Sequence, residues 1–364
     1  MKNVLFVAPE HNVGGIFSWA QVFREKFPQS EYRLYCVDNA PVREKKVSFF
    51  GRVVTGLAAL FRIKREIKSI LETTHIDIMH ATTSGSMGVL RDWCIGRICK
   101  KRKIKSILHC HYGCIPQTIN SHSLIGWGTL MSMKQYNQIW VLDRKSYQML
   151  QKIDTLKNRV RLTPNGINLE NQVVNIIPKQ YTQVAFIGNL LPSKGVGELV
   201  AAMMSVNENI SLHLVGGGDM DFISKIKTMA GSDWGKRIKY YGVLPNKDAI
   251  EFMNRMDVLV LPTYYKSEAF PISILEAMSL GKMVISTRRA AIPDMLTGAD
   301  GSLCGILVEE RNSKQLAEAI DWCHNHPVEA DKICERALQK VRQAYDLNTV
   351  YAEYRKNYRD LLTV

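Results

Sequence analysis

The residues best suited to chemistry are two glutamates that flank a short turn in the second half of the chain. Glu268 and Glu276 are separated by seven residues, with Phe270-Pro271 between them. Pro271 fits the first position of a helix, which predicts a helix beginning near Phe270 whose free N–H groups are available to a phosphate. Two carboxylates would repel a phosphate that they bound directly, but they accept hydrogen bonds from sugar hydroxyls. The segment therefore predicts recognition of a phosphate and of sugar hydroxyls at one place.

A cation for the phosphate is available in the loop Gly188–Gly195, which joins a predicted strand to a predicted helix. Ser193 is predicted to cap that helix, and Lys194 then projects from its first turn. A lysine there is unfavourable for the helix dipole, because the helix N-terminus is already positive. The pattern therefore favours an anion beside Lys194 over a lysine that only faces solvent.

Gly14-Gly15 is a second loop that could meet an anion, because it follows the first predicted strand and opens a helix. The alternative is that the two glycines form a simple tight turn that binds no anion. The loop lacks the full Gly-x-Gly-x-x-Gly pattern, which disfavours a dehydrogenase.

Two segments have some likeness to metal sites. His109-Cys110-His111, followed by Cys114, matches no standard zinc spacing, and histidines of the core are the alternative. Asp219-Met220-Asp221 follows three glycines and is interpreted as part of a surface loop. The eight cysteines include no Cys-x-x-Cys pair, which is typical of reduced thiols in a cytoplasmic protein.

These residues must be positioned by regular elements, and the chain alternates strands and helices throughout. Five strands are predicted in the first half, at Val4–Ala8, Tyr32–Val37, Ile76–His80, Ile104–His109 and Gln138–Leu142. Six are predicted in the second half, at Gln183–Gly188, Ser211–Gly216, Ile238–Tyr241, Val258–Leu261, Met283–Thr287 and Gly305–Val308. Helical stretches separate the strands, which predicts parallel sheets covered by helices on both faces. The expected fold class is α/β, with two Rossmann-like domains that face each other across a cleft.

Composition and charge describe a globular protein with one basic half. The 364 residues are 46% hydrophobic and 23% charged, which excludes disordered, collagen and coiled-coil chains. No segment has the length of a transmembrane helix and no signal peptide is recognised, so a soluble or peripheral protein is expected. The net charge is +14; residues 1–168 have a net charge of +15 and the remainder −1.

The excess positive charge gathers in two clusters, Arg43–Lys68 and Arg97–Lys105, beside a stretch with helical periodicity from Phe50 to Ile67. Such a basic amphipathic surface is typical of binding to an anionic membrane. An ordinary helix that packs on a sheet, with lysines on its solvent side, is the alternative. Nucleic acid is disfavoured as the polyanion, because the chain has no recognition motif or aromatic platform.

Residues 267–282 resemble the motif of retaining glycosyltransferases of the GT-B fold, in particular family 4, in which two glutamates separated by seven residues flank a Phe-Pro or Phe-Gly step. The similarity covers most of the chain, tightly in the C-terminal half and loosely in the N-terminal half. It extends to Gly14-Gly15, Pro164-Asn165-Gly166, Gly188 to Gly195, His213 to Gly218 and Ala291 to Asp294. The resemblance implies a nucleotide-sugar donor, linked to UDP or GDP, and no metal ion or other cofactor.

The resemblance also implies roles for individual residues. Lys194 would neutralise the donor diphosphate and Glu268 would contact the transferred sugar, while His111 is similar to the family's histidine near that sugar. Glu276 would bind the ribose hydroxyls. The remaining donor-binding positions are Gly14, Gly15, Gly188, Asn189, Phe270, Pro271 and Ile272.

The chain departs from the family pattern at Asn189, where many members place an arginine against the diphosphate. Arg24, Arg288 and Arg289 are candidates to replace that cation.

The resemblance further implies how the chain divides. In the family the last helix packs back on the N-terminal domain, so residues 348–364 are predicted to join residues 1–168. Residues 169–347 then form the donor domain, after a linker that runs to Pro178-Lys179.

We interpret the sequence as a retaining glycosyltransferase that moves a sugar from a nucleotide donor to a lipid-linked or polysaccharide acceptor. The product would be a surface glycan such as lipopolysaccharide, capsule or exopolysaccharide. The protein is expected in the cytoplasm, peripheral on the inner face of the cell membrane, which it binds through its basic N-terminal domain. A sugar-nucleotide epimerase is one alternative, disfavoured by the two glutamates. The other is a non-catalytic module that binds sugar nucleotides or a partner protein, motivated by Asn189.

Overall fold

The computed structural model describes residues 1–11, 14–28, 30–40, 49–170, 174 and 180–363. Their contacts form two compact units, one of Met1–Asn165 with Tyr351–Val364 and the other of Gly166–Val350. Sequence analysis places the corresponding boundaries after residues 168 and 347. Most of the predicted linker toward Pro178-Lys179, and the start of the basic cluster at Arg43, lie outside the described residues.

A parallel sheet of six strands forms the centre of the first unit. The strands are β1 (Lys2–Ala8), β2 (Tyr32–Asp38), β3 (Ile78–Thr83), β4 (Lys105–Cys110), β5 (Gln138–Val141) and β6 (Val160–Leu162). They are hydrogen-bonded in the order β2-β1-β3-β4-β5-β6, and each pair is parallel. The sequence pattern predicts the first five of these strands. It does not predict β6, because only one of its three residues is fully buried.

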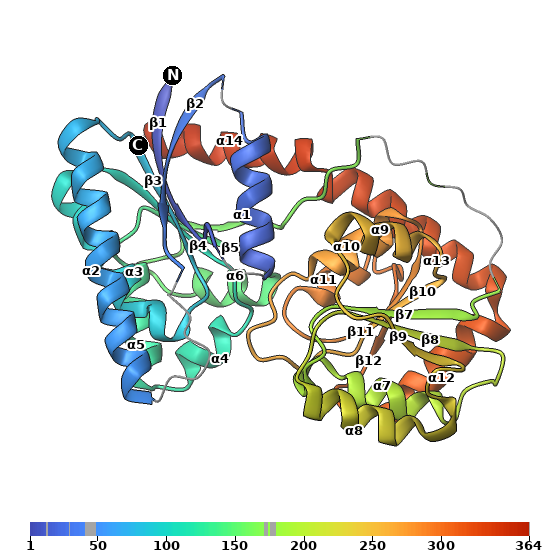
Figure 1. Ribbon diagram of the computed structural model, residues 1–364. Coiled ribbons are helices and arrows are strands. Elements are labelled where there is room, and N and C mark those ends of the chain that lie inside the picture. Colours follow the sequence, from blue (N-terminus) through green and yellow to red (C-terminus); the bar gives the residue numbers. More distant parts are fainter. Residues whose placement is uncertain (12–13, 29, 41–48, 171–173, 175–179, 364) are drawn as a thin grey trace. The chain divides into compact units, whose positions relative to one another are not determined.

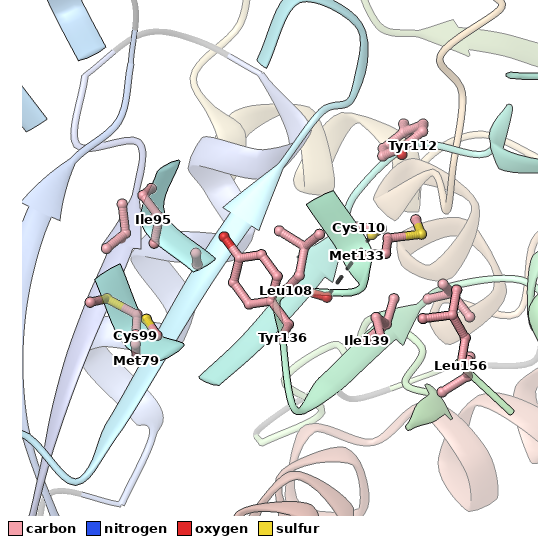
Figure 2. Close-up of a cluster of buried hydrophobic side chains, with 14 of the residues drawn as sticks. Met79, Ile95, Cys99, Leu108, Cys110, Tyr112, Met133, Tyr136, Ile139 and Leu156 are labelled. Carbon is pink, nitrogen blue, oxygen red and sulfur yellow. Dashed lines mark hydrogen bonds between the residues drawn. The ribbon is translucent and has the colours of Figure 1, made fainter. Parts of the chain in front are cut away.

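Helices pack on both faces of this sheet (Figure 1). They are α1 (Gly15–Lys26), α2 (Phe49–Thr73), α3 (Val89–Arg102), α4 (Ile115–Asn120), α5 (Leu124–Met133) and α6 (Arg144–Gln151), joined by α14 (Leu347–Thr363) from the end of the chain. On one face, Ile63 of α2, Ile95 of α3 and Met133 of α5 share a hydrophobic core with the strands. Figure 2 shows the part of this core around Leu108 and Tyr136.

The opposite face of the sheet is aromatic. Since successive side chains of a strand point to opposite faces, Phe6, His80 and Trp140 face away from the core of Figure 2. The ring of Phe23, from α1, stacks on Phe6 with 4.7 Å between centroids. The ring of Tyr354, from α14, lies 4.7 Å from that of Trp140. The C-terminal helix is therefore part of the core of the first unit.

The second unit is built on another parallel sheet of six strands. They are β7 (Gln183–Ile187), β8 (Ser211–Val215), β9 (Ile238–Tyr240), β10 (Val258–Leu261), β11 (Met283–Thr287) and β12 (Ile306–Val308), in the order β12-β11-β10-β7-β8-β9. The helices are α7 (Val196–Met203), α8 (Met220–Ala230), α9 (Asn246–Asn254), α10 (Ile272–Ser279), α11 (Ile292–Leu296), α12 (Ser313–Asn325) and α13 (Pro327–Lys340). The predicted α/β class with two Rossmann-like halves is confirmed. Because β7 and β10 are neighbours, the loops that follow them meet at one edge of the sheet.

Candidate functional site

The candidate site of the second unit lies where loops leave the carboxyl ends of β7, β8 and β10. Gly195 has a φ of +77°, and a side chain there would collide with the carbonyl of Pro262 after β10. Gly216 has a φ of +139°, and a side chain there would collide with the carbonyl of Gly188 after β7. Glycine is therefore required at both positions, where it lets the loops pack backbone against backbone.

Lys194 and Glu268 form an ion pair among these loops. The Nζ atom of Lys194 lies 2.6 Å from Oε2 of Glu268, and the Thr263 hydroxyl donates to the same oxygen at 3.0 Å. The lysine ammonium also lies over the ring of Tyr265, 5.3 Å from its centroid. Both bonds of Glu268 use Oε2, and Oε1 has no hydrogen bond within the described residues. One carboxylate oxygen thus holds the cation and the other can accept from a ligand hydroxyl.

The backbone around Lys194 differs from the prediction. Lys194 ends a short 3-10 turn, and α7 begins only after Gly195, whose left-handed conformation interrupts the helix. Ser193 therefore does not cap α7; its carbonyl accepts the N–H of Tyr264 instead. Since Lys194 precedes the helix, the ion pair with Glu268 accounts for its position without the argument from the helix dipole.

The helix predicted near Phe270 is α10, and it begins one residue later than expected. Pro271 occupies the N-cap position with φ −68° and ψ 118°, and Ile272 is the first helical residue. Phe270 is buried against Tyr345, with 5.4 Å between ring centroids, which fixes the point where the helix starts. No side chain caps α10. Its first N–H groups are therefore available to an anion.

Glu276 lies on the second turn of α10. Burial raises the pKa of its carboxyl, and a hydrogen bond from the side chain of Asn246, at the start of α9, partly offsets that rise. The helix thus presents N–H donors at its start and a desolvated carboxyl one turn later. Such an arrangement suits a ligand that carries both phosphate and hydroxyl groups.

The arginines considered as replacements for a cation at Asn189 all have partners of their own. Asn189 itself is exposed in the loop after β7. The pairs are Arg288 with Glu309 at 3.3 Å, Arg289 with Glu310 at 2.6 Å, and Arg24 with the carbonyl oxygen of Pro9 at 2.8 Å. Replacement of the family's arginine by one of them stays a prediction.

In the first unit, Gly14-Gly15 begins α1 directly beyond the loop after β1. Gly14 is the N-cap and Gly15 the first helical residue, both are exposed, and no side chain caps the helix. A side chain at either glycine would have no neighbour within 4 Å. The start of α1 therefore presents its N–H groups to open space, as an anion site requires.

His111 follows β4 directly, and its ring is held between Trp19 and His109, with centroids 4.4 and 4.1 Å away. Burial lowers the pKa of His111 to about 3, so its imidazole is neutral at physiological pH. The Nε2 atom is buried and has no hydrogen-bond partner within the described residues. A neutral ring with an unpaired nitrogen suits a hydroxyl ligand better than an anion.

A buried polar network behind His111 connects it to the C-terminal helix. Nε2 of His80 lies 3.2 Å from Nδ1 of His109, and Nδ1 of His80 lies 2.7 Å from the hydroxyl of Tyr358. Burial lowers the pKa of His80 to about 3 and that of His109 well below its usual value. Neutral imidazoles donate from one nitrogen and accept at the other, so the Tyr358 bond orients His80, and His80 in turn orients the His109 ring against which His111 packs.

Replacing Tyr358 with phenylalanine is expected to lower the free energy of unfolding by about 1–3 kcal/mol, because Nδ1 of His80 would stay buried without a partner. Chemical denaturation followed by circular dichroism measures the change. Tyr351→Phe, on the same helix, is the matched control, since the Tyr351 hydroxyl makes no hydrogen bond within the described residues. An equal loss in both variants would contradict the role given to the Tyr358–His80 bond.

Asp219-Met220-Asp221, interpreted from the sequence as part of a surface loop, is instead the start of α8. The side chain of Asp219 accepts the N–H of Asp221 at 3.0 Å and caps α8. Across the residues that the structure describes, no three His, Cys, Asp or Glu side chains are arranged to hold a metal ion. All eight cysteines are free thiols.

Three supporting residues are not singled out by the sequence. Thr263 bonds Glu268, Asn246 bonds Glu276, and His80 bonds the His109 ring. Thr263 could have been found, because it follows a predicted strand at its carboxyl end, where ligand-binding loops gather. The other two offer no local signal, since their partners lie about 30 residues away along the chain.

The sequence comparisons find similarity to sugar-transferring enzymes. Residues 168–341 match the family model for group 1 glycosyl transferases. An uncharacterized glycosyltransferase of Methanocaldococcus jannaschii is 26% identical over 300 residues, which cover 81% of this chain and 77% of the relative. The N,N'-diacetylbacillosaminyl-diphospho-undecaprenol alpha-1,3-N-acetylgalactosaminyltransferase of Campylobacter jejuni is 27% identical over 48% of this chain and 44% of its own.

Solved structures match the whole chain at low identity. Sucrose-phosphate synthase from Thermosynechococcus elongatus is similar with a TM-score of 0.79 at 16% identity, over 100% of both chains. HepE of Anabaena, in complex with UDP-glucose, has a TM-score of 0.71 at 15% identity, over 99% of this chain and 100% of its own. The likeness establishes the GT-B fold.

Proposed function

Because residues 168–341 match the family model for group 1 glycosyl transferases, we propose that this chain is a glycosyltransferase that retains anomeric configuration while moving a sugar from a nucleotide donor to a glycan or lipid-linked acceptor. The ion pair of Lys194 with Glu268 is the observation that carries the proposal. It places an ammonium suited to a diphosphate beside a carboxylate suited to a sugar hydroxyl. The half-buried carboxyl of Glu276 supports recognition of the nucleotide ribose, and UDP-glucose in HepE supports a UDP-linked donor.

In the proposed reaction, the bond between the anomeric carbon and the diphosphate oxygen breaks, and its electron pair leaves with the diphosphate. Lys194 stabilises the negative charge that develops on that oxygen. The acceptor hydroxyl attacks the oxocarbenium-like carbon from the face that the leaving group vacates. Its proton passes to the departing phosphate oxygen, so the configuration is retained without an enzyme nucleophile.

The other predicted residues are proposed to hold the donor. Glu268 accepts a hydroxyl of the transferred sugar through Oε1, and His111 bonds another hydroxyl of that sugar, a role that rests on the family resemblance. The backbone groups of Gly14, Gly15, Gly188, Asn189, Phe270, Pro271 and Ile272 are proposed to contact the nucleotide diphosphate. No metal ion or other cofactor is included in the proposal.

The acceptor is proposed to be a lipid-linked or polysaccharide intermediate of a surface glycan. The name of the Campylobacter relative specifies a diphospho-undecaprenol acceptor. The net charge of +15 on residues 1–168 supports a peripheral position on the anionic inner face of the cell membrane. Within the described residues, none of the helices combines the length and the apolar character needed to cross a bilayer.

A thermal-shift panel of UDP- and GDP-sugars is expected to identify the donor, because a ligand at 100 times its Kd stabilises the folded state by about 2.7 kcal/mol. The same panel, combined with candidate acceptors, is then assayed for transfer by release of nucleoside diphosphate, and the anomeric configuration of the product is read by NMR. Stabilisation by a donor without transfer or hydrolysis over a broad acceptor panel would contradict the proposal. That result would favour a non-catalytic binding module.

A further inference from the structure

We propose that the starts of α3 and α5 form an apolar anchor that inserts into the interfacial layer of an anionic membrane. The anchor consists of five large side chains that are exposed to solvent: Leu90, Trp93, Leu124, Ile125 and Trp127. Leu124 is 87% exposed and Trp127 is 63% exposed. The lipid-linked nature of the acceptor rests on the proposed function, whereas the anchor rests on this surface alone.

The anchor is displayed by closely packed helices. Ser123 caps α5 by accepting the N–H of Gly126. A side chain at Gly126 would collide with the carbonyl of Thr118 in α4, and Gly128 lies against Val89 of α3. These small residues turn the inner face of α5 toward α3 and α4. The large apolar residues of the anchor are consequently fixed on the outer face.

The positive charge around the anchor favours an anionic bilayer as the surface that the anchor binds. From residue 93 to residue 142 the chain has no Asp or Glu and seven Lys or Arg. A shallow groove between α2 and α3 is lined by Trp93 with Lys64, Arg97, Lys100 and Lys101. These four cations have no carboxylate partner within the described residues, and the guanidinium of Arg97 lies over the Trp93 ring, 5.6 Å from its centroid. Tryptophan beside unpaired cations suits the headgroup layer, where indole rings and lipid phosphates meet.

The anchor lies at the edge of the sheet where His111 is found. α3 follows the carboxyl end of β3, and α5 precedes β5, so both helices begin at the carboxyl edge of the sheet. His111 follows the carboxyl end of β4 at the same edge and leads into α4 and α5. Insertion of the anchor would therefore bring the edge of this unit that carries His111 to the membrane surface, where the sugar of a lipid-linked acceptor is exposed.

Vesicle co-sedimentation tests the anchor with the full chain. The wild type is expected to bind vesicles of phosphatidylglycerol mixed with phosphatidylcholine. Leu124→Ser/Trp127→Ser is expected to lower the partition coefficient at least about tenfold, because two large apolar side chains lose their burial in lipid. Met220→Ser/Val243→Ser is the matched control in the second unit, where the two side chains are 69% and 74% exposed, and it is expected to bind as the wild type does.

The depth to which the anchor inserts and the contribution of its positive charge to binding are tested in separate experiments. Brominated lipid is expected to quench tryptophan fluorescence in the wild type, and Trp93→Phe/Trp127→Phe, which removes both tryptophans of the anchor, is expected to remove most of that quenching while binding persists. Lys100→Glu/Lys101→Glu is expected to weaken binding most at low salt, since the charge contribution is screened as salt rises.

The proposal is overturned if Leu124→Ser/Trp127→Ser binds anionic vesicles as tightly as the wild type, or if the bound wild type is not quenched. It is also overturned if the anchor covers a second copy of the chain, seen as a dimer in size-exclusion chromatography that Leu124→Ser/Trp127→Ser dissociates. Stabilisation by the matching nucleotide sugar is expected to be unchanged in this variant. A failed anchor can thus be told apart from a failed assignment of sugar transfer.

Discussion

Replacing Lys194 with alanine is expected to lower kcat for sugar transfer about 100- to 1,000-fold, the cost of removing one preorganised group that stabilises developing negative charge. The lysine is preorganised because its ammonium is held 2.6 Å from Glu268 and over the ring of Tyr265. The donor found by thermal shift is used at saturation, so that the measured loss reports the chemical step. Lys266→Ala is the matched control: it removes an exposed lysine two residues from Glu268 and is expected to leave kcat nearly unchanged.

A double variant separates the two roles that Lys194 could have. If the lysine served only to neutralise Glu268, then Lys194→Met/Glu268→Gln would recover the activity of Glu268→Gln alone, because no unpaired carboxylate would remain. If it serves the diphosphate, the double variant stays as inactive as Lys194→Met alone. Recovery in the double variant, or loss of less than tenfold in Lys194→Ala, would contradict the catalytic role.

The strands of both sheets could be predicted because parallel sheets are buried on both faces. β10 is the clearest case: its four residues, Val-Leu-Val-Leu, are all buried, and its bounds Val258–Leu261 agree with the prediction. β6 shows the limit of the same reasoning. It lies at the edge of its sheet with two of its three residues only half-buried, so it lacks the apolar run that marks an inner strand.

The pairing of Lys194 with Glu268 could not be predicted, although both residues could. Each stands out by its own surroundings in the sequence, but 74 residues separate them. Their contact depends on β10 lying next to β7, an order of strands that differs from their order along the chain. The local prediction that Ser193 caps a helix fails for a related reason, because the left-handed Gly195 packs its backbone against Pro262 after β10 and α7 begins only beyond it.

The histidines show a similar limit of prediction from the sequence. His109 and His111 are two residues apart in the sequence, and only the resemblance to the family distinguishes them. In the structure His109 is bonded to His80 inside the sheet, whereas His111 lies beyond the end of β4. That difference comes from β3 and α14, which lie far from both histidines along the chain.

Replacing Glu276 with glutamine is expected to weaken donor binding about 10- to 100-fold, because a hydrogen bond to a charged acceptor contributes about 1.5–3 kcal/mol. The carboxylate is the form that accepts two ribose hydroxyls, and glutamine offers only one acceptor oxygen. Isothermal titration with the matching nucleotide sugar measures Kd. Glu251→Gln, which changes an exposed glutamate on α9, is the matched control and is expected to bind as the wild type does.

The pH dependence of donor binding is an independent test of the role of Glu276. Burial raises the pKa of Glu276, so its carboxyl takes up a proton at a higher pH than an ordinary glutamate, whose pKa is about 4.3. The affinity of the wild type for the donor should therefore fall as the pH is lowered through that raised pKa, while Glu276→Gln should bind weakly and without this change. Kd is measured at each pH with Glu251→Gln alongside. If Glu276→Gln kept the pH dependence of the wild type, another group would have to be the ribose acceptor, and the start of α10 would recognise phosphate alone.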